Sequence, residues 1–410
     1  MISLSVVENV NRSQIFRIGF VVATYGAGEL LISAISSISL AFEGIQRFNP
    51  HLVVVDNHPL SMDIGISQVV DAYLCLPHNP GFGAACNAGI KYLQGLAEFD
   101  FIMLLNPDAE ISVDFAINLL RFLDEGYYLH DVPISPLLLF SDSYFGATVE
   151  QALNLQESDF LEIFDCDRAL EIFDQYGSAR IKPNNNTFVL NASDYIVFPG
   201  EAADHTIFGR LNSFDLGTPI SKFTISTKKL APLKKINNAG SYIIPPFTVG
   251  DCLYGDLFIA NDWTKPVEAA LWCGAAVLLP KQYIDKVGLF DERFFLYYED
   301  ADVSLRGTRL GHNPIVVPDL IVFHAHSAIT GRNIGARQKQ IWRNRALFAC
   351  KNYGILFVIL LLMKLIIQGT PRQLRRSSIK HFVRWILPEI AETFFGILIG
   401  LKPSFWWRRK

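Results

Sequence analysis

Ile-Gly-Phe-Val-Val-Ala-Thr-Tyr-Gly, residues 18–26, forms the first regular stretch of this 410-residue chain. Its first six residues are an unbroken apolar run, which is typical of a strand buried on both faces of a parallel sheet. Thr24 and Tyr25 end the run, where a hydroxyl and an aromatic ring can meet a ligand. A simple strand-terminating turn is the alternative interpretation of this pair. The apolar residues that follow predict a helix over 29–40.

Further apolar runs of the same kind predict more buried strands, at Leu52–Val55, Ala72–Leu76, Phe101–Leu105 and Cys273–Leu279. Strands that alternate with helices predict an α/β fold with a doubly wound sheet. Polar residues follow the first strands directly, namely Asp56 and Asn57, Asn79, and Asn106 to Asp108. Ligands of such sheets bind beyond the carboxyl ends of the strands. We therefore expect a binding site along this edge.

Charge is distributed unevenly over the chain. Half of the residues are hydrophobic and 19% are charged, which indicates a sizeable core. The net charge of −4 combines +11 over residues 341–410 with −15 over the rest. A basic, apolar tail favours contact with an anionic membrane surface, and we expect no nucleic-acid partner. The six cysteines show no C-x-x-C spacing, so neither a zinc site nor a disulfide framework is predicted. Glu8 and its polar neighbours argue against a signal peptide.

Two regions depart from the alternation of strands and helices. An acidic stretch and then short alternating segments, such as Tyr195–Phe198, predict a β-rich insertion over residues 135–236. The final residues, 351–410, contain the apolar run Ile355–Ile367, which is shorter than the roughly 20 residues of a membrane span. Basic residues and terminal tryptophans beside such runs predict amphipathic helices lying in the membrane interface. A buried helical hairpin covering the sheet is the alternative.

A cluster of acids follows the aromatic run Phe294–Tyr298. Glu299, Asp300 and Asp302 lie within four residues, and the pattern from Glu299 onward predicts a helix. Asp302 and Arg306 are then one turn apart and can form an ion pair, which leaves Asp300 free. An acid beside apolar surface can have its pKa raised towards the range of a general base. The alternative is a solvated helix N-terminus, where acids complement the helix dipole.

The motifs occur in a specific order: Val22–Tyr25, Val55–Asn57, Asn79–Ile90, Asn106–Asp108, Cys273–Ala276 and Tyr298–Arg306. Through this ordered set the chain resembles inverting family 2 glycosyltransferases of the GT-A fold, in their rhamnosyltransferase-like branch. The resemblance covers about 18–130 and 236–350. It implies that 1–134 form the nucleotide-sugar-binding half and 237–350 the acceptor-binding, catalytic half of a mixed sheet. A transferase with a nucleoside-diphosphate sugar donor is therefore expected.

On the donor side, the resemblance implies a hydrogen bond from Asp56 to the nucleotide base, although a helix N-cap or an Asx turn with Asn57 also explains an acid there. The glycine-rich turn 79–89 is no dinucleotide fingerprint, because Cys86 replaces its last small residue and the turn follows the third strand. The donor-binding residues implied by the resemblance are Thr24, Tyr25, Asp56, Asn57, Asn79, Gly81, Asn87 and Asn106.

The resemblance also implies a divalent cation on the donor diphosphate. Asp108 is the expected ligand, with Asn106 where many family members have a first aspartate. His324 is the second candidate. His326 points to the opposite face of an extended segment and is therefore the weaker choice. Carboxylate oxygen suits Mg²⁺ or Mn²⁺, and the imidazole favours Mn²⁺.

For the chemistry, the resemblance implies that Asp300, paired with Glu299, is the general base that deprotonates the acceptor, and that Asp302 and Arg306 support it. Trp272 and the aromatic run can stack on sugars. We expect a protein at the cytoplasmic face of the membrane that uses dTDP-rhamnose and a lipid-linked saccharide in surface-polysaccharide (O-antigen) assembly. A non-catalytic sugar-binding scaffold is one alternative. A nucleotidylyltransferase is the other, although 24–29 lack the lysine it needs.

Overall fold

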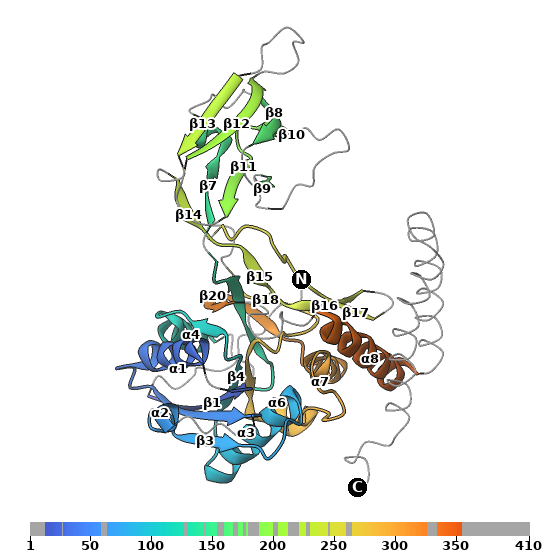
Figure 1. The fold of residues 1–410 in the computed structure, drawn as a ribbon. Helices are drawn as coiled ribbons and strands as arrows, with labels where there is room; N and C mark the ends of the chain where they lie inside the picture. The colour runs from blue at the N-terminus through green and yellow to red at the C-terminus, as the bar shows by residue number, and fades with distance from the viewer. Residues whose placement is uncertain are drawn as a thin grey trace.

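The core of the molecule is a mixed, ten-stranded sheet (Figure 1). The computed structural model describes residues 13–26, 28–58, 64–126, 130–142, 144–153, 160–166, 171–174, 178, 188–199, 204–211, 221–226, 230–244, 247–259, 265–325 and 334–354. Four parallel strands form one half of the sheet: β1 (Phe16–Thr24), β2 (Phe48–Asp56), β3 (Ala72–Cys75) and β4 (Phe101–Leu105). Each predicted strand of this half is confirmed. Because Thr24 pairs with Asp56 in the register of β1 and β2, the two polar ends lie side by side.

The other half of the sheet adds strands from later in the chain. β19 (Ala276–Pro280) runs antiparallel to β4, and next to it come β6 (Ile134–Phe140), β20 (Ile315–His324) and β18 (Val267–Glu268). Short strands β5 (Ala109–Ile111) and β15 (Ile236–Asn238) pair with β20 and β6. The predicted boundaries at 135 and 236 are therefore wrong, since β6 and β15 belong to the main sheet. The pairing of β5 with β20 brings Asp108 towards His324.

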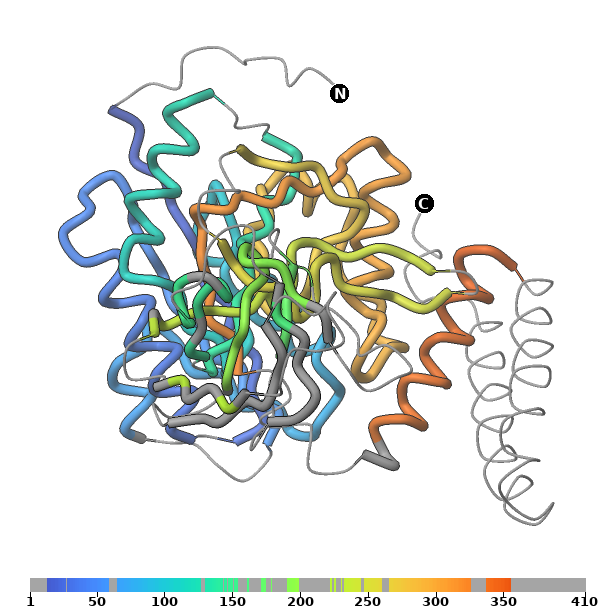
Figure 2. The backbone as a smooth tube through the Cα atoms, turned by 90° about the horizontal axis from the view of Figure 1, so that it is seen from above, coloured from blue at the N-terminus to red at the C-terminus, as the bar shows by residue number. Residues whose placement is uncertain are grey.

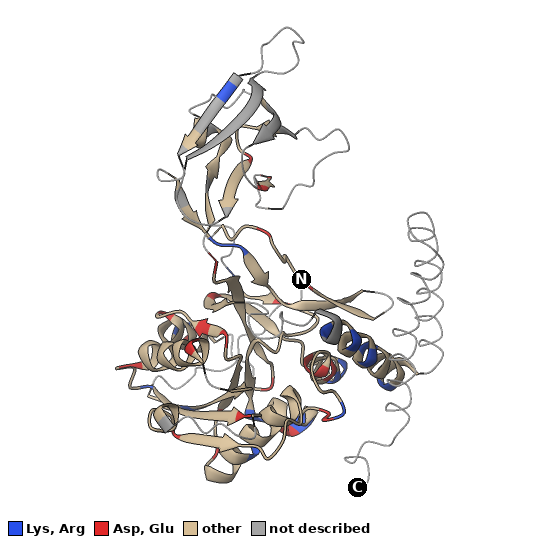
Figure 3. Ribbon diagram, viewed as in Figure 1, with Lys and Arg blue, Asp and Glu red and all other residues tan. Residues whose placement is uncertain are grey.

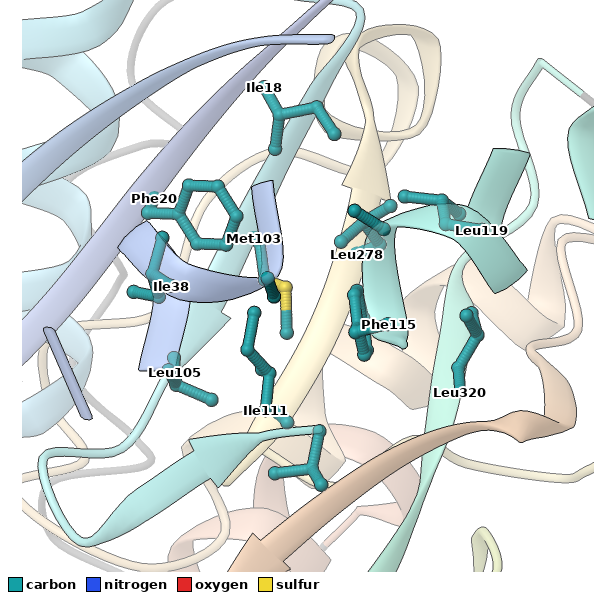
Figure 4. Close-up of a cluster of buried hydrophobic side chains, with 14 of the residues drawn as sticks. Ile18, Phe20, Ile38, Met103, Leu105, Ile111, Phe115, Leu119, Leu278 and Leu320 are labelled. Carbon is teal, nitrogen blue, oxygen red and sulfur yellow. The ribbon is translucent and has the colours of Figure 1, made fainter. Parts of the chain in front are cut away.

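Helices cover both faces of this sheet. α1 (Glu29–Phe42) and α4 (Phe115–Asp124) pack on one face, where β1 contributes Ile18, Phe20 and Val22 (Figure 4). α3 (Phe82–Leu96) and α6 (Lys281–Val287) cover the opposite face. α1 covers the helix predicted over 29–40, and it is amphipathic. Its buried residues form one stripe: Leu31, Ala34, Ile35, Ile38, Ala41 and Phe42.

A few further elements complete the main body. α2 (Ile64–Ser67) precedes β3, and the hairpin β16 (Ser241–Ile244) and β17 (Thr248–Asp251) lies near α7 (Glu299–Arg309). α8 (Ile334–Tyr353) runs beside α7 in both views (Figures 1 and 2). The predicted boundary at 350 therefore falls inside a helix. The predicted amphipathic tail lies outside the described residues from 355 onward.

Two antiparallel, four-stranded sheets stand away from the main sheet, at one end of the molecule (Figure 1). Their strands fall between Tyr144 and Leu233. Lys235 lies at their base, where its ammonium group contacts Glu171 and lies 4.1 Å from the centre of the Tyr144 ring. Their elements are β7 (Tyr144–Thr148), α5 (Val149–Leu153), β8 (Phe160–Cys166), β9 (Glu171–Phe173), β10 (Phe188–Asn191), β11 (Tyr195–Pro199), β12 (Asp204–Leu211), β13 (Ser221–Ser226) and β14 (Ala231–Leu233).

Within the described part of the chain, no helix has the length and apolar character needed to cross a membrane.

Candidate active site

A pocket of about 240 Å³ opens at the carboxyl ends of β1, β2 and β4, where the sequence predicted a site. Most of the predicted donor-binding and metal-binding residues line it. Aromatic and aliphatic residues that precede α7 form another part of the wall. The lining consists of Ala23, Thr24, Tyr25, Asn57, Asn79, Gly81, Phe82, Asn106, Pro107, Asp108, Phe295, Leu296, Tyr297, His324 and Arg337.

The end of β1 offers an aromatic ring at the pocket. Thr24 is buried, and its hydroxyl donates to the Gly26 carbonyl oxygen at 2.7 Å, so this hydroxyl stabilises the turn. Tyr25 is 54% exposed and lies edge-on to the His58 ring, with 5.0 Å between the ring centres. An exposed ring at a pocket can stack on a nucleotide base. Thr24 therefore fits the alternative interpretation of a strand-terminating turn, while the exposed ring of Tyr25 remains available to a ligand.

Asp56 is fully buried behind the pocket. Its Oδ1 accepts hydrogen bonds from the backbone N–H groups of Gly26 (2.9 Å) and His58 (2.8 Å), and its Oδ2 accepts one from the Tyr73 hydroxyl (2.7 Å). The bond to His58 is the Asx turn that was the alternative interpretation of this acid. Asn57, and not Asp56, lines the pocket.

The turn after β3 joins the pocket to the segment that precedes α7. The side chain of Asn79 accepts from the Gly81 N–H at 3.0 Å, and both residues line the pocket. Asn87 is fully buried, exchanges two hydrogen bonds of 3.0 Å with the Phe290 backbone, and is not part of the lining. It fastens α3 to the segment before α7. The expected contribution of Asn87 to the pocket floor is therefore indirect.

Asp108 and His324 meet in the pocket although they are 216 positions apart in the sequence. Nε2 of His324 lies 3.4 Å from Oδ1 of Asp108, and both side chains are buried. Nδ1 of His324 lies 3.0 Å from Oδ1 of Asn237. Because a carbonyl oxygen can only accept, Nδ1 donates this hydrogen bond, and in a neutral ring Nε2 then presents its lone pair to the carboxylate. Asn106 lines the pocket beside this pair.

This donor set fits a divalent cation that is shared with a substrate. A lone pair and a carboxylate that face each other at 3.4 Å repel unless a proton or cation lies between them. Within the described residues, no group of three or more His, Cys, Asp or Glu side chains could hold a metal. Mg²⁺ is commonly held by one or two carboxylates together with substrate phosphates, so two protein ligands are sufficient. His326 lies outside the described residues.

The two acids at the start of α7 lie in different environments. Glu299 is 4% exposed, and burial together with the nearby charge of Asp300 raises its pKa well above the usual range. Burial also raises the pKa of Asp300, while hydrogen bonds from the N–H groups of Gly274 (2.9 Å) and Ala301 (2.8 Å) oppose this shift. Asp300 lies outside the Asp302–Arg306 ion pair, as predicted, and two backbone N–H groups orient its carboxylate. Burial thus disfavours the charged form of both acids, more strongly for Glu299 than for Asp300.

Known proteins give limited but consistent matches. No protein-family model matches the chain. An N-acetylglucosaminyl-diphospho-decaprenol L-rhamnosyltransferase of Mycobacterium tuberculosis is 33% identical over 89 residues, which are 19% of this chain and 29% of that relative. The match thus spans less than a third of the relative's length. The predicted resemblance is confirmed. The chain is similar to the GT-A glycosyltransferases.

Solved glycosyltransferase structures also align with the chain over most of its length. GalNAc-T7 with UDP, GalNAc and Mn²⁺ has a TM-score of 0.48 and 11% identity, covering 92% of this chain and 58% of that one. Mannosyltransferase PcManGT of Pyrobaculum calidifontis, in complex with GDP-Man and Mn²⁺, has a TM-score of 0.42 and 10% identity, covering 99% and 91%. TarS of S. aureus has a TM-score of 0.41 and 11% identity, covering 93% and 81%.

The predicted ion pair in this glycosyltransferase-like chain is part of a larger network. Nε of Arg306 lies 3.2 Å from Oδ2 of Asp302, which is fully buried. The same oxygen accepts from Nζ of Lys351 at 2.7 Å, and Oδ1 accepts from Asn352 at 3.1 Å. The predicted ion pair is thus present, and Asp302 also joins α7 to α8.

The structure corrects the predicted role of one residue and adds two residues to the site. Trp272 was expected to stack on sugars, but it is 1% exposed and donates to the Tyr283 hydroxyl at 3.2 Å, so it belongs to the core. Asn237 orients His324, and Arg337 of α8 brings a positive charge to the pocket. No local motif marks either residue. Arg337 stacks over the Tyr297 ring at 5.6 Å, which holds its guanidinium group against the lining.

Proposed function

We propose that this protein transfers a sugar from a nucleoside-diphosphate sugar to a saccharide acceptor, with inversion at the anomeric carbon. The observation that carries the proposal is the Asp108–His324 pair inside a pocket at the carboxyl ends of the parallel strands. A diphosphate needs positive charge, and Arg337 lies in the same lining. Such a pocket suits a nucleotide better than a neutral sugar alone.

The donor lies with its base near Tyr25 and Asn57 and its diphosphate near Asp108, His324 and Arg337. Asp108 and His324 would hold Mg²⁺ or Mn²⁺, whose charge offsets the negative charge that develops on the leaving diphosphate. Arg337 adds hydrogen-bond donors to that charge without needing a metal. Asn237 keeps the His324 ring in the tautomer that a metal ligand requires.

Asp300 takes the proton of the acceptor hydroxyl in this proposal. As the oxygen attacks C1 of the donor sugar, the bond from C1 to the diphosphate oxygen breaks on the opposite face. The proton ends on the Asp300 carboxylate, and the electron pair leaves with the diphosphate. A single displacement of this kind inverts the anomeric configuration. The Gly274 and Ala301 N–H groups hold the carboxylate in place during the step.

Similarity to the mycobacterial rhamnosyltransferase supports dTDP-rhamnose as donor and a lipid-linked saccharide as acceptor. Such a reaction belongs to the assembly of cell-surface polysaccharides, including O-antigen. Residues up to about 134 bind the nucleotide end of the donor, while 237–350 add His324 and Arg337 to the diphosphate site, bind the acceptor and supply the base. The two small sheets between β6 and β15 form an insertion in this arrangement.

The proposal predicts that the purified protein with Mn²⁺ releases a nucleoside diphosphate from one member of a panel containing dTDP-rhamnose, UDP-GlcNAc and GDP-mannose. The matching nucleoside diphosphate at 100 times its dissociation constant should stabilise the fold by about 2.7 kcal/mol. Asp108→Ala is the control and should lose the Mn²⁺-dependent part of both effects. The proposal would be contradicted if no donor released a nucleoside diphosphate and no nucleoside diphosphate raised the melting temperature.

We also propose that the protein binds peripherally to the inner face of the plasma membrane through its basic C-terminal region. Residues 341–410 carry thirteen Lys or Arg and two Asp or Glu. Basic residues also recur along α8 (Figure 3). Each basic residue near an anionic surface contributes about 1 kcal/mol, and salt weakens the attraction.

A chain shortened to end at Gly354 should therefore stay folded but lose binding to vesicles that contain anionic lipid. It keeps Lys351 and Asn352, which hold α8 to Asp302. Co-sedimentation with vesicles at low and high salt measures the difference. Aggregation of the shortened chain would favour the buried-hairpin alternative, as would a full-length chain that ignores vesicles at low salt.

A further inference from the structure

The turn that leads into α7 is strained. Tyr297 and Tyr298 both have φ of 72°, in the left-handed region that side chains other than glycine rarely adopt. Two such residues in a row persist only where the surroundings hold them. Asp300 follows two positions later, so the direction in which the chain leaves this turn determines where its carboxylate lies. A relaxed turn would move Asp300 away from the Gly274 N–H.

Asn344 of α8 stabilises this turn through side-chain hydrogen bonds. Its side-chain N–H₂ group donates to the carbonyl oxygens of Leu296 at 2.7 Å and Tyr297 at 2.8 Å, and the residue is fully buried. Its own carbonyl oxygen accepts from Nε of Arg343 at 3.1 Å, which fixes the orientation of the amide. Both donors of one buried side chain are thus used on consecutive carbonyl oxygens of the turn.

The neighbouring contacts of α8 hold the same region. The ring of Phe348 packs against Tyr298, with 5.5 Å between the ring centres, and the Tyr298 hydroxyl donates to the Phe247 carbonyl at 3.0 Å. Leu296 and Tyr297 line the pocket, and so does Arg337 from the first half of α8. α8 is therefore in contact with both the pocket wall and the turn before the base.

We propose that Asn344 is a positioning residue for glycosyl transfer, which acts by holding the left-handed turn that presents Asp300. This inference rests on the proposed function for its kinetic readout. Asn344 touches neither the substrate nor Asp300, so its effect passes through the backbone of 296–300. A displacement of about 1 Å at a reacting group can cost roughly 100-fold in rate.

A double-mutant cycle tests the mechanism. Asn344→Ala is expected to lower kcat about tenfold to 100-fold. In a Tyr297→Gly background the loss should be much smaller, because glycine adopts positive φ without strain and no longer needs the amide. Asn352→Ala is the matched control: it removes an α8 hydrogen bond to Asp302 but none to the turn, and should leave kcat unchanged. Equal losses of kcat in both backgrounds would overturn the proposal.

Hydrogen exchange gives a second readout that does not need turnover. Exchange within residues 294–303 should accelerate in Asn344→Ala while exchange in β4 stays as in the wild type. A uniform acceleration would indicate general destabilisation, and no acceleration would show that the turn holds itself. Either result overturns the inference. If Asn344→Ala does not fold, Asn344→Ser, which keeps one donor, replaces it. Absence of transfer activity in the wild type would contradict the proposed function. The exchange result would still show whether Asn344 holds the turn.

Discussion

Asp300→Asn is expected to lower the transfer rate about 10²–10⁴-fold, the usual contribution of a general base, and to leave the dissociation constant of the donor unchanged. The amide keeps the shape of the carboxylate but cannot take the acceptor proton. Asp300 is not part of the donor pocket lining, so donor binding does not depend on its charge. Single-turnover rates and donor titrations measure the two quantities separately.

The pH dependence of the wild type should identify the same group. A base works only when ionised, so the rate falls as pH falls through the pKa of Asp300. Because burial raises that pKa, the fall should begin at a higher pH than for an exposed aspartate. The variant should lack this acid limb. A wild-type limb that persists unchanged in Asp300→Asn would assign it to another group.

Asp302→Asn is the matched control two positions along the same helix. Asp302 is fully buried and accepts from Lys351 and Arg306, so the substitution leaves two cations partly unpaired. Breaking a buried ion pair costs about 3–5 kcal/mol, which lowers the melting temperature. Any molecules that remain folded should keep their turnover. If Asp302→Asn were stable but inactive while Asp300→Asn stayed fully active, the assignment of the base to Asp300 would be wrong.

The parallel half of the sheet could be predicted because its information is local. Buried parallel strands are continuous apolar runs, and Phe101–Leu105 was found without error at either end. β20 passes through Pro318 and Asp319, two residue types that locally favour a turn. Pairing of β20 with β6 continues past them through a register shift between Val317 and Ile321. Such a bulge depends on the partner strand, which a local pattern does not contain.

The site could be predicted only where residues end strands. Thr24, Asn57 and Asp108 gather at one edge because parallel strands end there. Asn237 acts through one hydrogen bond to His324, 87 positions away, and Asn344 through two, to residues 48 and 47 positions away. Neither asparagine lies in a recognisable spacing. Their contribution follows from tertiary contacts alone. Asp56 shows the opposite case: it ends a strand, but its carboxylate accepts a hydrogen bond within its own turn and does not line the pocket.

The second large effect is expected at Gly81, whose φ is 100°. A Cβ there would overlap the Phe295 carbonyl oxygen and lie 2.8 Å from its carbon. The backbone cannot move aside easily, because the Phe82 N–H donates to that oxygen at 2.9 Å. Left-handed strain alone costs about 1–2 kcal/mol in an alanine, and the overlap adds to it. Gly81→Ala should therefore destabilise the fold by roughly 3 kcal/mol or more.

Gly95→Ala separates this effect from a general response to glycine replacement. Gly95 lies in α3, the helix that begins directly after Gly81, and a Cβ there meets nothing within 4 Å among the described residues. Alanine should stabilise the fold at this position by about 0.4–1 kcal/mol, mainly by restricting the unfolded chain. Urea unfolding of both variants gives the two free energies. Because Gly81 and Phe295 both line the pocket, Gly81→Ala should also weaken nucleotide binding, while Gly95→Ala should not. Similar stability for the two variants would mean that the turn after β3 is not held against the catalytic segment as the structure shows.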